Sequence, residues 1–68
     1  MGMSLLEEKE QRLIHRKGLA AAVLGVMSHA VSINAPIYAE AVRPVFEAIT
    51  KEMDELKAQI VEYRERAR

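Results

Sequence analysis

The stretch from Gly18 to Ala39 constrains the fold more than any other part of the chain. It contains no charged residue apart from His29 when that side chain is protonated, although charged residues are frequent on both sides of it. Large apolar residues and alanines fill it, so a helix through this stretch is apolar on nearly every face. Such a helix must be buried on all sides. It therefore has to pack against the other half of the chain, a second copy or another protein.

The size of the chain limits how much of this burial it can supply itself. With 68 residues, the sequence is expected to form one domain over residues 1–68, below the size at which a single core comfortably stabilises a monomer. Cysteine is absent, so disulfides and thiolate metal sites are excluded. Ten basic and ten acidic side chains cancel, which disfavours a dedicated nucleic-acid-binding protein. Association with itself or with a target is the remaining source of stability.

A first helix is predicted over about residues 4–33. Ser4 and Glu7 form the Ser-x-x-Glu pattern of a capping box. We expect the helix to continue through Gly18, because the apolar pattern crosses this glycine without a change of phase. The seam expected to face the rest of the chain consists of Leu6, Leu13, Ala20, Leu24, Met27 and Val31.

The uncharged stretch carries a second apolar seam on the same helix. This seam consists of Leu19, Val23, Val26, Ala30 and Ile33. One seam can pack on the other helix of the chain, so the second needs a separate partner. It is the feature of the sequence that says most about function.

A second helix is predicted over about residues 36–66, after a break at Asn34-Ala35-Pro36. Asn accepts turn geometry, and Pro favours the first turn of a helix. Pro44 should kink this helix or restart it. The main seam of the helix is Val42, Phe46, Ile49, Met53, Leu56, Ile60 and Tyr63, and a second stripe near the turn is Tyr38, Ala41, Val45 and Ala48.

Two helices of about thirty residues joined by a tight turn predict an all-α antiparallel two-helix hairpin. The doubly apolar halves of the helices meet at the turn, and the charged halves meet at the termini. Two hairpins packing through their turn ends would form a four-helix bundle, so we expect a homodimer. In architecture alone, this outline resembles the small plasmid- or phage-encoded regulators of the Rop type.

The sequence shows no set of residues suited to catalysis, cofactor binding or metal binding. His15 and His29 lie about 21 Å apart along one helix and cannot share a metal ion within it. Ser28 and His29 point about 100° apart, and no carboxylate lies nearby to orient the imidazole. We therefore expect no enzymatic activity, no cofactor, no metal and no small-molecule substrate.

The uncharged stretch is long enough to be considered as a membrane span. Its second half is interrupted by Ser28, His29, Ser32, Asn34 and Pro36. The first residues of the chain include several glutamates rather than a basic patch followed by an apolar core, so no secretory signal is expected. We expect a cytoplasmic protein with no membrane span.

One segment resembles the helix-turn-helix family of DNA-binding proteins. The matching residues are Ala21, Leu24, Gly25, Val26, Ala30, Val31 and Ser32. The resemblance implies that Ser28, His29 and Ser32 would face the major groove and that the heptads of Val42–Tyr63 would dimerise the module. Asn34 occupies a position that should be apolar, Pro36 shortens the recognition helix, and the uncharged stretch offers no Lys or Arg to hold phosphates. DNA binding is therefore disfavoured, but it stays open as an alternative.

The surplus seam without a catalytic set favours a small non-enzymatic regulator that binds and modulates or inhibits another protein, such as a transcription factor or a motor ATPase. The expected partner or dimer interface is Leu19, Val23, Val26, Ala30, Ile33, Tyr38, Ala41 and Val45. Tyr38, Arg43 and Phe46 are expected anchors for a partner, because Tyr and Arg are favoured in interfaces. Two alternatives remain: a dimeric helix-turn-helix DNA-binding regulator and a structural coiled-coil assembly module.

Overall fold

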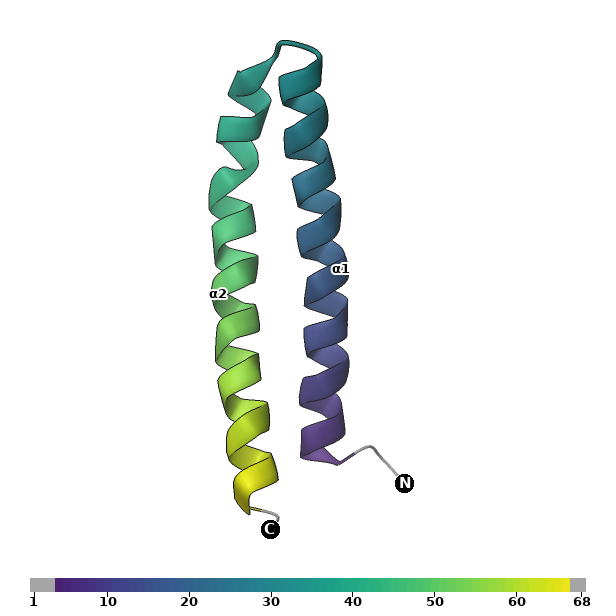
Figure 1. Cartoon of the computed structure of the whole chain (residues 1–68), viewed down its shortest axis with the longest axis vertical. Coiled ribbons are helices and arrows are strands. Elements are labelled where there is room, and N and C mark those ends of the chain that lie inside the picture. The colour runs from purple at the N-terminus through teal and green to yellow at the C-terminus, as the bar shows by residue number, and fades with distance from the viewer. Residues whose placement is uncertain (1–3, 67–68) are drawn as a thin grey trace.

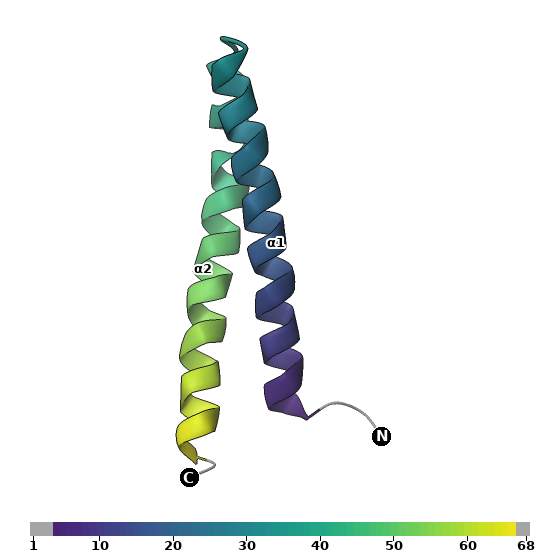
Figure 2. The same cartoon turned by 45° about the vertical axis from the view of Figure 1, so that its right-hand side comes forward.

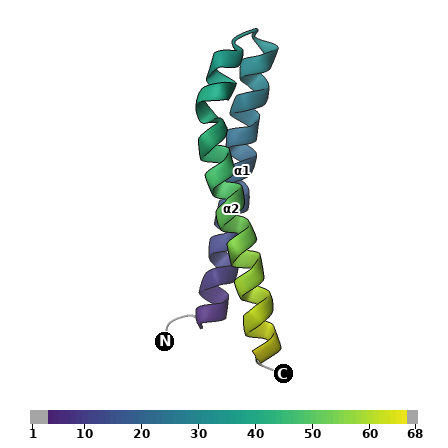
Figure 3. The same cartoon turned by 90° about the vertical axis from the view of Figure 1, so that its left-hand side faces the viewer.

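The computed structural model describes residues 4–66, which form an antiparallel hairpin of two long helices (Figure 1). Helix α1 spans Leu5–Ser32 and helix α2 spans Pro36–Arg66. The molecule is a rod with extents of 51 × 22 × 13 Å. The two helix axes are inclined to each other, as the turned views show (Figures 2 and 3). The predicted all-α hairpin is confirmed, and its helix bounds agree with the prediction to within one residue.

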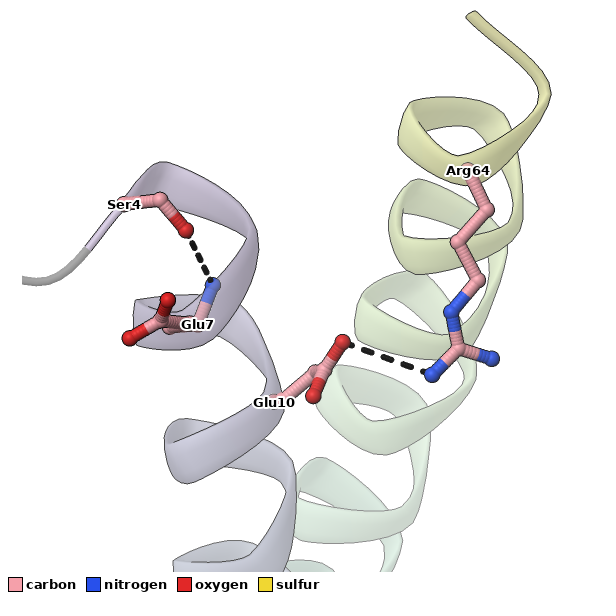
Figure 4. Close-up of polar contacts among 4 residues, drawn as sticks. All are labelled: Ser4, Glu7, Glu10 and Arg64. Carbon is pink, nitrogen blue, oxygen red and sulfur yellow. Dashed lines mark hydrogen bonds and ion pairs between the residues drawn. The ribbon is translucent and has the colours of Figure 1, made fainter. Parts of the chain in front are cut away.

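Helix α1 begins at the predicted cap and is continuous to the turn. Ser4 has an extended backbone, and its side-chain oxygen accepts a hydrogen bond from the backbone N–H of Glu7 at 3.2 Å (Figure 4). Glu7 and Glu8 lie in the first turn, where a carboxylate stabilises the positive end of the helix dipole. The helix passes through Gly18, which confirms the expected continuity.

A Schellman motif ends α1. The N–H of Ala35 donates to the carbonyl of Ala30 at 2.8 Å, and the N–H of Asn34 donates to the carbonyl of Val31 at 3.0 Å. Asn34 has a φ of 59°, in the left-handed region that Asn tolerates better than most residues. Pro36 then opens α2, so the break predicted at this point is confirmed.

Helix α2 is a single helix that includes Pro44. The helix therefore does not restart at this proline. Pro44 has no N–H to donate to the carbonyl of Glu40, one turn earlier. Its side chain is exposed, so solvent can reach this part of the helix surface.

The contact between the helices follows a seven-residue repeat. Covered positions recur in α1 at Leu6, Lys9, Leu13, Arg16, Ala20, Val23, Met27 and Ala30. They recur in α2 at Ala39, Val42, Phe46, Ile49, Met53, Leu56, Ile60 and Tyr63, which confirms the predicted main seam of the second helix. Among the described residues, the buried hydrophobic core consists of Ala30, Ala39, Leu56 and Ile60. This core is small for a protein that has to fold alone.

The seam predicted for the first helix is wrong at Leu24 and Val31, which are 51% and 63% exposed. Val23 and Ala30, predicted to lie in the outer seam, take their places against α2. Val23 and Leu24 are adjacent and both apolar, as are Ala30 and Val31. Hydrophobicity alone therefore did not show which residue of each pair faces α2. The small side chain of Ala30 suits the turn end of the hairpin, where a short connection holds the helices close together.

Candidate protein-interaction surface

Two polar contacts join the terminal halves of the helices on one side of the hairpin. The Nε of Arg16 lies 3.0 Å from the Oε2 of Glu52, and the Nζ of Lys9 donates to the Oε1 of Gln59 at 2.6 Å. The Lys9 ammonium also lies 5.8 Å from the centroid of the Tyr63 ring, within cation–π range. We call this side of the hairpin the Arg16 side.

A shallow groove lies on the opposite flank of the seam, at the same end of the hairpin. It has a volume of about 430 Å³ and is lined by Glu10, Leu13 and Ile14 from α1 and by Lys57, Ile60, Val61 and Arg64 from α2. The Nη2 of Arg64 lies 3.3 Å from the Oε1 of Glu10, so this ion pair connects the two helices across the groove (Figure 4). Glu10 follows Lys9 directly, and successive helical residues point about 100° apart, which puts the two on different flanks of the seam. We call this the groove side.

The Arg16 side becomes apolar towards the turn. On α2, the row that contains Glu52 continues at seven-residue intervals with Val45 and Tyr38, and the seven-residue repeat of the seam keeps each row on one side. On α1, the corresponding row is Leu19, Val26 and Ile33, which begins three residues after Arg16. The exposed fractions of these five residues lie between 38% and 62%. We call Leu19, Val26, Ile33, Tyr38 and Val45 the turn-half surface.

Of the residues predicted for the partner or dimer interface, some lie on the turn-half surface and others lie in the seam between the helices. Ala41 is exposed and lies between Tyr38 and Val45, one turn from each. Val23 is half-buried in the seam. Ala30 is only 3% exposed, because α2 covers it, and it is not accessible to another molecule in the hairpin.

The three predicted anchors for a partner lie in different parts of the hairpin and not on one surface. Tyr38 is on the turn-half surface, where it is exposed. Phe46 is half-buried in the seam between the helices. Arg43 is exposed and lies in the row of Lys57 on the groove side, with its Nη2 3.5 Å from the Oε1 of Glu40.

The apolar residues of the groove side were missed in the sequence. Leu24 and Val31 were assigned to the core, whereas Ile14 and Val61 belong to neither predicted seam and are 60% and 53% exposed. Ile14 and Val61 could have been found as large apolar residues in otherwise charged segments. Finding Leu24 and Val31 required knowing the register of α1.

Within residues 4–66, no group of three or more His, Asp or Glu side chains is placed to hold a metal ion. The two histidines are exposed, and the Nδ1 of His15 is 2.7 Å from the Nη1 of Arg16. No described helix combines the length and apolar character that crossing a membrane requires.

The segment that resembles a helix-turn-helix lies inside α1. The helix is unbroken from Leu5 to Ser32, so Gly25 does not form a turn and Ser28 does not begin a separate recognition helix. The helix-turn-helix geometry expected for the DNA-binding alternative is therefore not present in this segment.

Comparison of the chain with family models, with curated proteins and with solved structures finds no match. The surfaces of the hairpin are therefore the basis for a proposed function.

Proposed function

We propose that this protein is a small non-enzymatic regulator that binds another protein through the turn-half surface and thereby modulates or inhibits it. One observation supports the proposal: five large apolar side chains are exposed together on a hairpin whose described core contains only four buried residues. Contiguous apolar patches of this kind are typical of protein-binding sites. Blocking a surface of a transcription factor or a motor ATPase is the mode of action that suits so short a chain.

Covering the turn-half surface would also stabilise the hairpin. Full burial of a large aliphatic or aromatic side chain contributes about 1.5–3 kcal/mol. The five residues are roughly half exposed, so about half of that contribution is still available at each position. A partner that binds the folded hairpin in preference to the unfolded chain raises its free energy of unfolding. Binding and stability are therefore linked in this protein.

We propose further that two copies cover this surface on each other when no target is bound, as a four-helix bundle. A two-fold symmetric dimer would bring the same patch of each copy together, and both helices of each hairpin would contribute to the contact. The ion pair of Arg16 with Glu52 limits the contact to the turn halves, because burying these two charged side chains would be costly. We place this activity in the cytoplasm, with which the lack of Cys is compatible.

Site-specific photo-crosslinking in the native host tests the proposal. A crosslinking side chain at Val26 should attach to the target, whereas the same group at Lys51, which is exposed on the face of α2 away from the seam, should not. With the identified target purified, Val26→Asp and Tyr38→Asp should each weaken binding by roughly tenfold or more while circular dichroism stays helical. Lys51→Glu serves as the control and should bind normally. Retained binding in both surface variants would contradict the proposal.

The two alternative functions give different results. A DNA-binding regulator would bind labelled duplex DNA with an affinity that falls steeply as salt rises. Unchanged fluorescence anisotropy at low salt would eliminate it. A purely structural coiled-coil module would form higher oligomers and would show no heterologous partner at Val26.

A further inference from the structure

We infer that His29 makes the self-association of the hairpin sensitive to pH: protonation of its imidazole ring separates two copies that are joined through their turn-half surfaces. The inference rests on the proposed function and deepens it, because a second copy has to cover the turn-half surface for His29 to act. It follows from the position of His29 and from the side chains that surround it.

His29 lies at the edge of the turn-half surface. On α1, it follows Val26 by three residues and precedes Ile33 by four. The N–H of Ile33 donates to the carbonyl of His29 at 3.0 Å, so the helical turn between the two is formed. Residues three and four apart on a helix are neighbours, about 5–6 Å apart between Cβ atoms. A second copy that covers Val26 and Ile33 therefore also covers His29, which is exposed beside them in the single hairpin.

The outer rows on this flank are alanine near the turn. On α1, Ala22 precedes His29 by seven residues and is exposed. On α2, the corresponding row contains Ala41 and Ala48, which are also exposed. The alanine side chain has no polar atom, so these positions supply no acceptor for the N–H groups of a charged imidazole ring.

The carboxylates of α2 near the turn lie on the other flank of the seam. Glu40 and Glu47 share the row of Val61, on the groove side, and Glu40 pairs with Arg43. Within residues 4–66, the His29 ring takes part in no ion pair and no hydrogen bond. Tyr38 is the other titratable group of the turn-half surface, and a phenol is ordinarily neutral below about pH 9.

The charged groups on the same flank are further from the turn. They begin with Arg16 and Glu52, which pair with each other. Arg16 precedes His29 by thirteen residues, about 20 Å along the helix. Glu55 lies one turn beyond Glu52 towards the termini, and Lys51 is on the face of α2 away from the seam. The middle of the contact therefore offers a protonated His29 no carboxylate from its own chain.

Protonation of His29 has a different cost in the two states. In the single hairpin the ring is exposed, and water hydrates its charge. In the dimer the charged ring loses water to an apolar surface and gains no partner, so the dimer favours the neutral ring. Histidine ordinarily changes charge between pH 5 and 8. Because the single hairpin binds more protons than the dimer, association is strongest where histidine is neutral and is lost as the pH falls.

Sedimentation equilibrium at about pH 8 and about pH 5.5 tests this inference, since ordinary carboxylates are ionised at both values. The dissociation constant of the wild-type dimer should rise by roughly tenfold or more at the lower pH, because each dimer covers two His29 rings. His29→Gln and His29→Leu cannot be protonated there, and each should have the same dissociation constant at both pH values. His15→Gln is the control, because His15 lies in the row of His29 but in the terminal half, and this variant should keep the wild-type response.

The outcomes separate this inference from the proposed self-association. A wild-type dimer that is equally tight at both pH values would overturn the inference alone. The inference is also overturned if the neutral variants keep the wild-type response or both fail to dimerise at the higher pH, or if association strengthens at the lower pH because a carboxylate of the second copy pairs with His29. A wild-type protein that is monomeric at both pH values would contradict the proposed self-association and this inference with it.

Discussion

The guanidinium of Arg16 lies 3.0 Å from the carboxylate of Glu52, and this ion pair stands at the boundary between two different halves of the hairpin. Towards the termini, charged side chains from both helices border the seam and keep that half compatible with water. Towards the turn, α1 has no charged residue beyond Lys17 except His29 when protonated. This difference is the basis of the proposal that a partner covers the turn half.

Removal of this ion pair should have a small effect on stability. Glu52→Gln is expected to lower the free energy of unfolding by about 0.5–1 kcal/mol, because both side chains are partly exposed and the attraction is screened. Urea unfolding followed by circular dichroism measures the change. Glu62→Gln, whose partner Arg66 is on the same helix, should cost about 0.3–0.5 kcal/mol. A loss above about 2 kcal/mol for Glu52→Gln would contradict an exposed pair.

The register of α1 can be tested with two adjacent substitutions. Val23→Asp places a carboxylate in the seam against α2 and should destabilise the hairpin by about 3 kcal/mol or more. Leu24→Asp places it on the exposed groove side and should change the stability by less than about 1 kcal/mol. Thermal unfolding of both variants provides the comparison. If Leu24→Asp lost more stability than Val23→Asp, the result would favour the register predicted from the sequence, in which Leu24 faces α2.

The turn should respond to changes at Asn34. Asn34→Ala is expected to cost about 1 kcal/mol, because a Cβ is disfavoured at a φ of 59° and Ala has no polar side chain to compensate. Asn34→Gly should be neutral or slightly stabilising, since Gly adopts this conformation without strain. The midpoints of thermal unfolding rank the three proteins. If Ala and Gly have the same midpoint, the left-handed turn is not formed in solution.

The small core should be sensitive to truncation. Leu56→Ala removes a buried side chain of the seam and is expected to cost about 2–4 kcal/mol, a large share of the stability of a hairpin this size. Val61→Ala removes an exposed side chain on the same helix and should cost less than about 1 kcal/mol. Chemical unfolding curves distinguish the two. Similar losses would mean that Leu56 is not a core residue.

The helices and the turn were predictable because local signals agreed. The Ser4 cap, the Asn34 turn and Pro36 define the helix ends through backbone chemistry that needs no tertiary information. The seam of α2 was also predictable, because charged residues border seam positions such as Met53 and Leu56 and leave one register.

The register of α1 and the groove side were not predictable in the same way. Val23 and Leu24 are both apolar, as are Ala30 and Val31, so the pattern fits two phases that differ by about 100° around the helix. Packing against α2 selects one of them. The exposed surface of α1 follows from that choice, which is why the apolar residues of the groove side emerged only from the structure.

Sedimentation equilibrium over a wide concentration range tests the turn-half surface most directly. We expect the wild-type protein and Lys51→Glu to form a dimer that dissociates on dilution, and Val26→Asp to be a helical monomer at every concentration. Val26 is more than half exposed in the hairpin, so its replacement should act on association and not on the fold. A wild-type protein that stays monomeric throughout, or a Val26→Asp variant that still dimerises, would contradict the proposed self-association through this surface.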